Sequence, residues 1–206
     1  MKKEKEQIDK LKFEKEEQQK GKLLIAGVDE VGRGPLAGPV CVACVIMPLD
    51  DLIEGVDDSK KLSEKKREEL FEKIKEKAIC HSIKMVDEQT IDKINILEAT
   101  KLAMKNAIES MEIKPDIVLI DAINKLDVDV EIRGIIKGDA LSYSIGCASI
   151  LAKVTRDRFM CELAKEYPEY GFEKHKGYGT KAHIEALKQY GPCIYHRLSF
   201  LKFLGE

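Results

Sequence analysis

Residues 23–40 read LLIAGVDEVGRGPLAGPV, in which an apolar run leads directly into two acids and then into a turn rich in glycine and proline. A short apolar run bounded by turn residues predicts a buried strand, here residues 23–28. A second apolar run, residues 40–47, begins where the turn ends. Such a short connection favours an antiparallel, hairpin-like pair of strands.

Similar patterns continue along the chain. Apolar runs predict further strands at residues 79–86, 117–120 and 130–136. Helical spacing and capping residues predict helices at residues 63–77, 96–111, 138–167 and 180–189. Strands that alternate with helices favour an α/β fold, in which helices flank a five-stranded mixed sheet and a helical segment ends the chain.

Residues 1–22 differ in composition from the rest of the chain. Fourteen of these 22 residues are charged, with both signs mixed, and Ile8, Leu11 and Phe13 form a thin apolar stripe. This pattern predicts an exposed helical appendage that ends near Gly21. An arm that binds a partner or nucleic acid is the alternative. The remaining residues, 23–206, are enough for one well-cored domain.

The composition limits the class of protein. No apolar run approaches the ~20 residues that span a bilayer, and no apolar segment follows the charged first residues. We therefore expect neither a membrane protein nor a secreted one, but a cytoplasmic protein whose six cysteines are free thiols. A net charge of −2 is unlike that of a dedicated nucleic-acid binder. An enzyme with an acidic metal site could still carry a local basic groove within a nearly neutral total.

Three acids stand at the carboxyl ends of predicted strands, namely Asp29, Glu30 and Asp121. Open α/β sheets place their functional sites at that edge. Asp157 lies on the predicted long helix, which could hold it against the strand ends. Carboxylates that converge repel one another unless cations lie between them, and hard oxygen ligands suit Mg²⁺ or Mn²⁺. Two such ions, ~3.5–4 Å apart, can activate a water and stabilise the leaving oxygen in phosphodiester cleavage.

Some of these acids also have simpler interpretations. Asp121 alone could cap the next helix or turn. Asp157 alone could be the surface i,i+4 partner of Lys153. Asp29 and Glu30 are harder to explain in this way, because they end an apolar strand directly before the glycine-rich turn.

Two turns present groups that could contact a ligand. The turn Gly32-Arg33-Gly34 places a cation between two residues that lack a Cβ atom. Glycine allows unusual backbone angles and the close approach of a ligand to main-chain groups. The second turn, residues 177–180, presents Tyr178 before a helix, where the ring could pack the turn or stack on a sugar or base.

Basic and polar residues elsewhere could contact phosphates. Lys60 and Lys61 begin a basic cluster near a helix start, which is either a solvated face or a phosphate-binding group. Ser149, Lys153 and Asp157 repeat every four residues and therefore share one polar stripe of the long helix. We include Lys60, Lys61, Ser149 and Lys153 among the candidate substrate-binding residues.

Six segments, in the same order, resemble the motifs of the ribonuclease HII family. They are residues 29–40 (DEVGRGPLAGPV), 58–62 (DSKKL), 137–139 (KGD), 148–158 (ASILAKVTRDR), 177–180 (GYGT) and 196–200 (HRLSF). Together they cover the chain from about Leu23 to Phe200. The sister family, ribonuclease HIII, usually has a differently composed glycine turn and an extra N-terminal domain, for which residues 1–22 are too short.

The resemblance implies a ribonuclease H-like fold and a catalytic domain at residues 23–206. It implies that the catalytic, metal-binding carboxylates are Asp29, Glu30, Asp121 and Asp157. The implied cofactor is Mn²⁺ or Mg²⁺, with two ions per site.

The resemblance also implies a substrate and a way of reading it. The turn Gly32-Arg33-Gly34 and Tyr178 would read the junction between RNA and DNA. Cleavage would occur on the 5′ side of a ribonucleotide, in RNA–DNA hybrids and at single ribonucleotides within duplex DNA, and would leave a 3′-hydroxyl and a 5′-phosphate. We expect a monomer that does not contact membranes.

Two other functions compete with this prediction. One is another metal-dependent nuclease of the same fold, such as a junction resolvase or a 3′–5′ exonuclease, and the glycine turn with Tyr178 argues against it. The other is a nucleic-acid-binding module without catalysis, and the presence of all four carboxylates argues against it.

Overall fold

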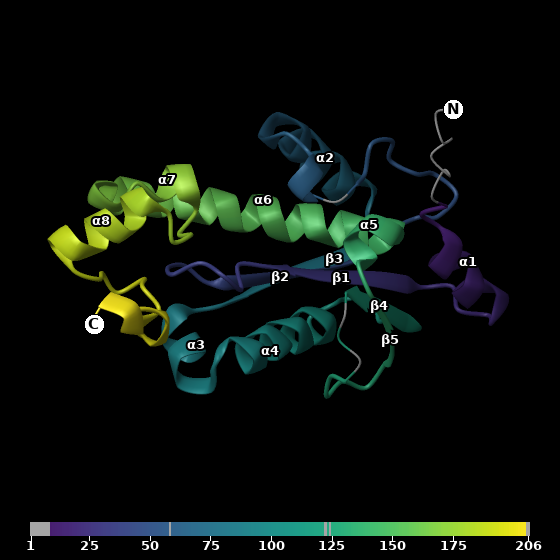
Figure 1. Cartoon of the computed structure of the whole chain (residues 1–206). Helices are drawn as coiled ribbons and strands as arrows, with labels where there is room; N and C mark the ends of the chain where they lie inside the picture. The colour runs from purple at the N-terminus through teal and green to yellow at the C-terminus, as the bar shows by residue number, and fades with distance from the viewer. Residues whose placement is uncertain (1–8, 58, 122, 124, 205–206) are drawn as a thin grey trace, which may run out of the picture.

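A five-stranded sheet lies at the centre of the computed structural model, which describes residues 9–57, 59–121, 123 and 125–204 (Figure 1). Its strands are β1 (Ile25–Val31), β2 (Val40–Ile46), β3 (Cys80–Val86), β4 (Ile117–Asp121) and β5 (Glu131–Ile135). In the order β3-β2-β1-β4-β5, β1 pairs antiparallel with β2 and parallel with β4. The predicted mixed sheet and the hairpin-like β1–β2 pair are therefore confirmed. The prediction that the first strand begins at Leu23 was wrong, since Leu23 is largely exposed.

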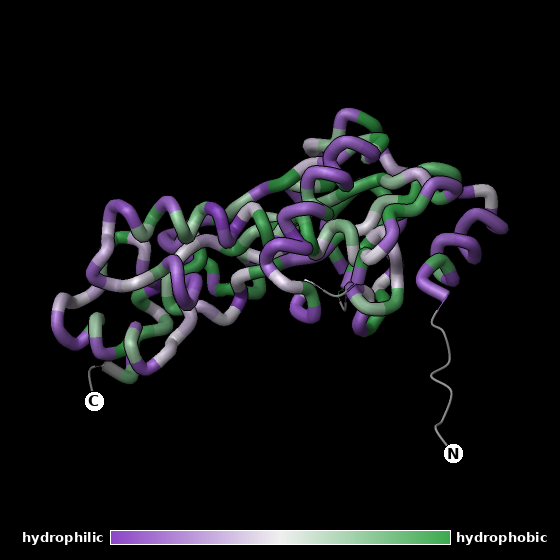
Figure 2. The backbone as a smooth tube through the Cα atoms, turned by 90° about the horizontal axis from the view of Figure 1, so that it is seen from above, coloured by the Kyte–Doolittle hydropathy of each residue, from purple (hydrophilic) through white to green (hydrophobic). Residues whose placement is uncertain are grey.

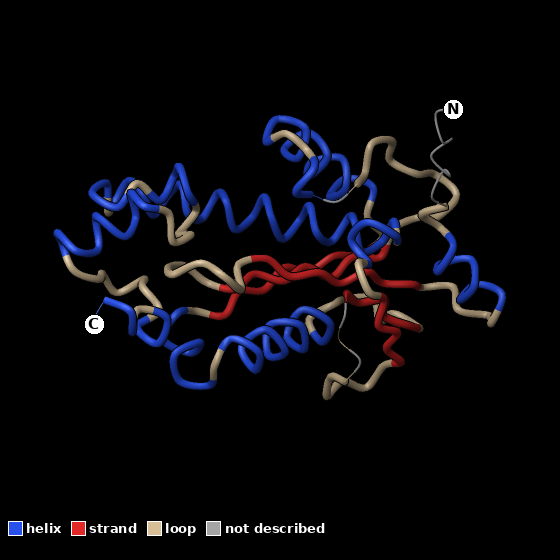
Figure 3. Tube along the Cα trace, in the orientation of Figure 1, coloured by secondary structure: helices blue, strands red, loops and turns tan. Residues whose placement is uncertain are grey.

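Helices cover both faces of the sheet (Figures 1 and 3). The α-helices are α1 (Lys12–Gln19), α2 (Glu64–Lys77), α3 (Glu88–Ile94), α4 (Ile96–Glu109), α5 (Gly138–Leu141), α6 (Tyr143–Glu166), α7 (Phe172–His175) and α8 (Lys181–Tyr190). Short 3-10 helices are η1 (Ser59–Lys61), η2 (Pro168–Tyr170), η3 (Leu198–Phe200) and η4 (Lys202–Leu204). The predicted caps of α2 and α8 are confirmed, because the side chains of Ser63 and Thr180 accept hydrogen bonds from the first helical turns.

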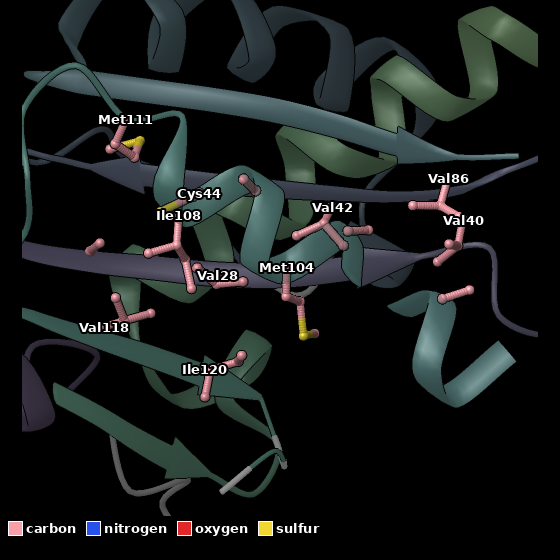
Figure 4. Packing of buried hydrophobic residues seen from close by; sticks show 14 of the residues in the cluster. Val28, Val40, Val42, Cys44, Val86, Met104, Ile108, Met111, Val118 and Ile120 are labelled. Carbon is pink, nitrogen blue, oxygen red and sulfur yellow. The ribbon is translucent and has the colours of Figure 1, made fainter. Parts of the chain in front are cut away.

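Alternate residues of the central strands face opposite helices. One core cluster lies between the sheet and α4 and includes Val28, Val42, Cys44, Met104 and Ile108 (Figure 4). The other lies between the sheet and α6 and includes Cys41, Ala43, Val45, Ile150 and Leu151. Cys41 and Cys44 thus face opposite sides of β2, because successive residues of a strand alternate between its faces, and the six cysteines are free thiols.

Gly27 lets α6 lie directly on β1. A Cβ atom at Gly27 would stand 2.1 Å from the carbonyl carbon of Ser144 and 2.4 Å from the backbone nitrogen of Ile145. Only a residue without a side chain leaves room for backbone this close. The first turn of α6 therefore rests on the central strand, and the side chains that α6 carries follow the course of β1.

The helix predicted from residue 138 to residue 167 is broken near its start. α5 ends at Leu141, Ser142 is extended with φ −116° and ψ 132°, and α6 begins at Tyr143. The Ser142 side chain accepts a hydrogen bond from the Ile145 N–H, which is the normal arrangement of a helix N-cap. The break gives α5 its own direction, separate from that of α6.

The expectation that α1 is an exposed appendage was wrong for its inner face. Glu14 and Glu17 are fully buried. Glu14 Oε1 accepts hydrogen bonds from Ser142 Oγ at 2.6 Å and from the Ser144 N–H at 3.0 Å. Arg133 on β5 donates to Glu17 at 2.5 Å. These contacts dock α1 against the start of α6 and the edge of the sheet.

Residues 1–8 lie outside the described residues, so the division at residue 22 stays a prediction.

α1 and the α7–α8 segment lie at opposite ends of the molecule, and α1 is coloured mostly hydrophilic (Figure 2). Within the part of the chain that the structure describes, no helix combines the length and the apolar character needed to cross a membrane.

Candidate active site

Three acids meet where β1 and β4 end. Val28 pairs with Ile120 in the parallel ladder, so the next residues along the two strands, Asp29 and Asp121, stand side by side. Glu30 follows Asp29 on β1. The sequence therefore predicted these three positions correctly, because adjacent parallel strands end at the same edge of a sheet.

The electrostatics show that these carboxyl groups are close and desolvated. Burial, followed by the charges of Glu30 and Asp121, raises the pKa of Asp29 well above its usual range. Burial also raises the pKa of Glu30, although Arg33 Nη1 lies 3.4 Å from Glu30 Oε1 and opposes the shift. Burial and then the charge of Asp139 raise the pKa of Asp121. Each ionised acid thus makes it harder to ionise its neighbours.

Asp139 is the fourth acid at this edge. It lies in α5 and is 8% exposed. Its neighbour Gly138 donates a backbone hydrogen bond to Asp121 Oδ1 at 3.1 Å. Lys60 Nζ lies 3.5 Å from Asp139 Oδ2. Asp139 was not among the site residues predicted from the sequence, although it is the acid of the KGD segment.

Asp157 is not part of this group of acids. Its Oδ1 lies 2.7 Å from Lys153 Nζ, and its Oδ2 lies 3.9 Å from Arg67 Nη2. Ser149, which hydrogen-bonds to Asp29, precedes Asp157 on α6 by two turns, or ~12 Å along the helix axis. The contacts of Asp157 are thus those of an i,i+4 ion pair, and the acids that raise the pKa values of the strand-end carboxyls are one another and Asp139.

The donor set fits a hard divalent cation. Glu30 Oε2 is buried without a hydrogen-bond partner among the described residues, and Asp29 is nearly inaccessible. Among the described residues, no three acidic, histidine or cysteine side chains form a ready group around one ion. A cation between Asp29, Glu30 and Asp121 would satisfy the unpaired oxygen and relieve the repulsion that raises their pKa values.

Ser149 on α6 holds Asp29 through a hydrogen bond. It is 4% exposed, donates a hydrogen bond to Asp29, and its Oγ lies 2.9 Å from Ser59 Oγ. Because Ser149 is buried, its contacts in the structure are those of a residue that orients Asp29.

The glycine turn after β1 is held by two buried arginines. Gly32 has φ +93°, and a Cβ atom there would stand 2.3 Å from Arg156 Nε. Arg197 Nη2 donates to the Gly32 carbonyl at 2.6 Å, and Arg197 Nη1 donates to the Arg33 carbonyl at 3.1 Å. Arg156 Nε donates to the Pro39 carbonyl at 2.8 Å. The turn is therefore fixed through its backbone carbonyls.

Both arginines are fully buried, which lowers their pKa values. Burial lowers the pKa of Arg156, and burial together with the charge of Arg156 lowers the pKa of Arg197 to about 9. The carboxyl of Glu88, at the start of α3, is also buried, and burial raises its pKa to about 7. Its charge acts on both guanidinium groups. None of these three residues was predicted from the sequence, although Arg156 and Arg197 belong to segments that carry the family resemblance.

Tyr178 lies against the same turn. The Leu36 N–H donates to the Gly177 carbonyl at 2.8 Å, and a Cβ atom at Gly177 would stand 2.4 Å from the Ala37 carbonyl oxygen. At Gly34 a Cβ atom would be 3.7 Å from Cε1 of Tyr178. The structure thus brings Gly34 and the half-exposed Tyr178 ring together.

Of the predicted basic residues, Lys60 contacts an acid of this edge, and Lys61 and Lys153 pair with other acids. Lys60 lies beside Asp139, and Lys61 Nζ is 3.8 Å from Asp57 Oδ1. Lys153 pairs with Asp157, as described above. Asp58, the first residue of their sequence motif, lies outside the described residues. Exposed cations beside an acidic edge can meet phosphates as a nucleic acid approaches.

Comparisons with known proteins agree on one family. A family model described as Ribonuclease HII matches residues 26–203. A curated protein named Ribonuclease HII from Caldicellulosiruptor saccharolyticus is 59% identical over 197 residues, which are 95% of this chain and 96% of that protein. A second, from Caldicellulosiruptor bescii, is 60% identical over 192 residues, or 92% of this chain and 93% of that protein.

Solved structures show the same fold. The ribonuclease H2 of Pyrococcus horikoshii matches with a TM-score of 0.72 and 31% identity, over 86% of this chain and 93% of that one. A structure described as Bst-RNase HIII in complex with Mn²⁺ matches with a TM-score of 0.66 and 20% identity, over 82% of this chain and 63% of that one. At that identity the second match is a likeness of fold.

Proposed function

Because this chain belongs to the ribonuclease HII family, it is a metal-dependent ribonuclease H endonuclease that acts on RNA–DNA substrates, and we propose that the acids at the β1–β4 edge are its catalytic centre. The observation that carries this proposal is the meeting of Asp29, Glu30 and Asp121 at one sheet edge, where burial and the charges of neighbouring acids raise all three pKa values. Outside a metal site such an arrangement would only weaken the fold.

For the fourth carboxylate, the geometry favours Asp139 over the predicted Asp157. Asp139 acts electrostatically on Asp121, whereas Asp157 is occupied by Lys153 and Arg67. Asp29, Glu30, Asp121 and Asp139 would hold Mn²⁺ or Mg²⁺, two ions per site, because carboxylate oxygens suit these hard cations. When bound, the ions supply an activated water and stabilise the leaving oxygen of the phosphodiester.

The residues around the acids have two proposed roles, to orient Asp29 and to attract phosphates. Ser149 orients Asp29 through its hydrogen bond; the direct substrate contact predicted for Ser149 stays a prediction. Lys60, Lys61 and Lys153 would attract the phosphates that flank the cleaved bond.

The turn Gly32-Arg33-Gly34 and Tyr178 form the reading surface of the proposed site. Because Gly34 has no side chain, the Tyr178 ring lies against the turn, and the turn and the ring together form one surface on which a ribose could rest. We assign to this surface the recognition of the 2′-hydroxyl and cleavage on the 5′ side of the ribonucleotide.

A gel assay tests the proposal. The substrate is duplex DNA that holds one ribonucleotide, compared with an RNA–DNA hybrid and with plain DNA. The parent should cut 5′ of the ribonucleotide and leave a 3′-hydroxyl. Asp29→Asn should lower the rate by at least about 100-fold, the size expected for an electrostatic group of the reaction, while the protein stays folded.

The matched control is Asp127→Asn, because Asp127 is an exposed acid that pairs with Lys105 away from the sheet edge. It should cut like the parent. Near-normal turnover of Asp29→Asn at saturating Mg²⁺ and Mn²⁺ would contradict the assignment of the site, and cleavage of plain DNA would indicate a different nuclease.

A further inference from the structure

Three of the chain's four histidines gather behind the Tyr178 turn. His175 ends α7, His183 lies on α8, and His196 precedes Arg197. The rings of His175 and His183 are stacked with their centroids 4.5 Å apart, and those of His183 and His196 are 5.2 Å apart. His183 and His196 are almost inaccessible to solvent. The proposed chemistry uses none of these imidazoles.

The hydrogen bonds determine which nitrogen carries each proton. The Cys193 N–H lies 2.9 Å from His196 Nδ1, which must therefore accept. His183 Nδ1 lies 2.9 Å from the Tyr178 carbonyl oxygen, which can only accept, so His183 Nδ1 must donate. A neutral imidazole has one N–H, so the proton of His196 is on Nε2. The two Nε2 atoms are 3.0 Å apart, and His196 donates to His183.

The result is a chain of hydrogen bonds with one direction, from the backbone of Cys193 to the carbonyl of Tyr178. Every ring nitrogen in it has one fixed task. An added proton on His183 would place two N–H groups opposite each other between the rings. An added proton on His196 would do the same toward Cys193. The chain therefore requires both imidazoles to be neutral, and burial lowers the pKa of both.

The backbone of Tyr178 is held on its other side as well. His175 Nδ1 accepts from the Gly177 N–H at 3.2 Å, and the His175 carbonyl accepts from the Tyr178 N–H at 2.9 Å. The ring of Tyr178 is the half-exposed part of the residue and faces Gly34. Fixing the carbonyl and the N–H therefore fixes where the ring meets a ligand.

We infer that His196 and His183 form a buried positioning pair that holds Tyr178 in its reading orientation. The pair acts through the Tyr178 carbonyl and touches no substrate. The effect on cleavage rests on the proposed function of Tyr178; the effect on the position of Tyr178 does not. Losing the pair should lower cleavage at a single ribonucleotide relative to cleavage of an all-RNA strand by about fivefold, the equivalent of one ordinary hydrogen bond.

The first experiment compares five variants with the parent under single-turnover conditions on both substrates. His183→Phe keeps an aromatic ring but removes the bond to Tyr178, and His196→Asn keeps the acceptor for Cys193 but removes the donor to His183. Both variants should lower the rate at a single ribonucleotide relative to the rate on an all-RNA strand, as Tyr178→Ala should. Combining His183→Phe with Tyr178→Ala should lower this ratio no further than Tyr178→Ala alone. His183→Asn, whose amide can still donate to the Tyr178 carbonyl, should restore the ratio.

The second experiment observes position without substrate. Because the chain contains no tryptophan, Tyr178→Trp introduces a single fluorescent reporter. Acrylamide quenching of this tryptophan should increase with His183→Phe and His196→Asn, and should not change with His183→Asn or with His81→Asn, a histidine of β3 outside the cluster.

If His183→Phe and His196→Asn both leave the quenching unchanged, the positioning role is wrong. The positioning role is also wrong if His183→Phe and His196→Asn lower the cleavage rates on both substrates equally while Tyr178→Ala changes the ratio of the two rates. If Tyr178→Ala itself leaves the ratio unchanged, the proposed reading function of Tyr178 fails, and the quenching result alone decides whether the histidines position it.

Discussion

Replacing Asp139 and Asp157 separately by asparagine should change stability and activity in opposite ways. Both substitutions keep the shape of the side chain and remove one negative charge. Asp139 belongs to the repelling acids, whereas Asp157 belongs to an ion pair. The two variants therefore distinguish the position that the sequence predicted from the one that the geometry favours.

The magnitudes follow from the surroundings of each acid. The Lys153–Asp157 pair has side-chain exposures of 17% and 12% and a separation of 2.7 Å. Neutralising one partner of a partly buried ion pair, which lies between the exposed and the fully buried cases, lowers the free energy of unfolding of the protein by about 2 kcal/mol. For a chain of this size, that corresponds to a fall of roughly 4–8 °C in Tm.

Asp139→Asn should leave Tm level or raise it in the absence of metal, because it removes a charge that faces Asp121. Little stability is lost with its partner Lys60, which is 79% exposed. Its activity should fall by at least about 100-fold. Asp157→Asn should keep cleavage within about tenfold of the parent, because Asp157 lies two turns of α6 beyond Ser149, the residue that holds Asp29, and its loss only frees Lys153 from an ion pair.

The assay pairs thermal melting in EDTA with single-turnover cleavage of a duplex that holds one ribonucleotide. Isothermal titration with Mn²⁺ adds an independent reading, in which Asp139→Asn should bind more weakly and Asp157→Asn like the parent. The reasoning is refuted if Asp157→Asn abolishes cleavage and Mn²⁺ binding at an unchanged Tm while Asp139→Asn remains active.

Two further predictions concern stability. Gly27→Ala should lower Tm by roughly 6–12 °C, because its Cβ atom meets α6 backbone at 2.1 Å and overpacking of this kind costs about 3 kcal/mol. The control is Gly34→Ala, whose Cβ atom has room at 3.7 Å and which should melt like the parent. Equal Tm values for the two variants would show that α6 shifts easily to accommodate the added methyl group. Burial lowers the pKa of His196 from 6.5 to about 4, so from pH 6.5 down to about 4 the unfolded chain binds a proton that the folded protein excludes, and stability falls as the pH falls. Melting curves across that range should show a shallower acid slope for His196→Asn than for the parent, and identical slopes would remove His196 from the explanation.

The sheet and three of the acids were predictable because their signals are local. An apolar run that ends in Asp29 and Glu30, and another that ends in Asp121, are visible in the sequence alone. Parallel pairing of their strands then requires the acids to meet. No contact beyond the two strands is needed for that part of the argument.

Asp139 was not predictable in the same way, because its place depends on the break at Ser142. Residues 138–167 can be read as one continuous helix, in which Asp157 is a plausible inward acid. The structure stops α5 at Leu141 and caps α6 with Ser142, whose hydroxyl also donates to the buried Glu14. That contact comes from residues that composition alone assigns to solvent.

The buried charges were missed for a related reason. Arg156 and Arg197 bind backbone carbonyls. Because every residue has a carbonyl, no pattern of side chains in the sequence predicts these contacts. A charged residue is usually exposed, and sequence reasoning therefore places it on the surface. Glu88, whose charge acts on both, has no spacing that links it to them.

α6 connects the two halves of the proposed site through a shared spacing. Ser149 holds Asp29, and Arg156 lies against Gly32. From Ser149 to Arg156 a helix rises ~10.5 Å, and from Asp29 to Gly32 a strand advances ~10 Å. Because the two lengths match, one helix on one strand orients a carboxylate of the proposed metal site and the turn that we propose reads the ribose. A shift of α6 along β1 would disturb both together, and the close backbone contact at Gly27 opposes such a shift.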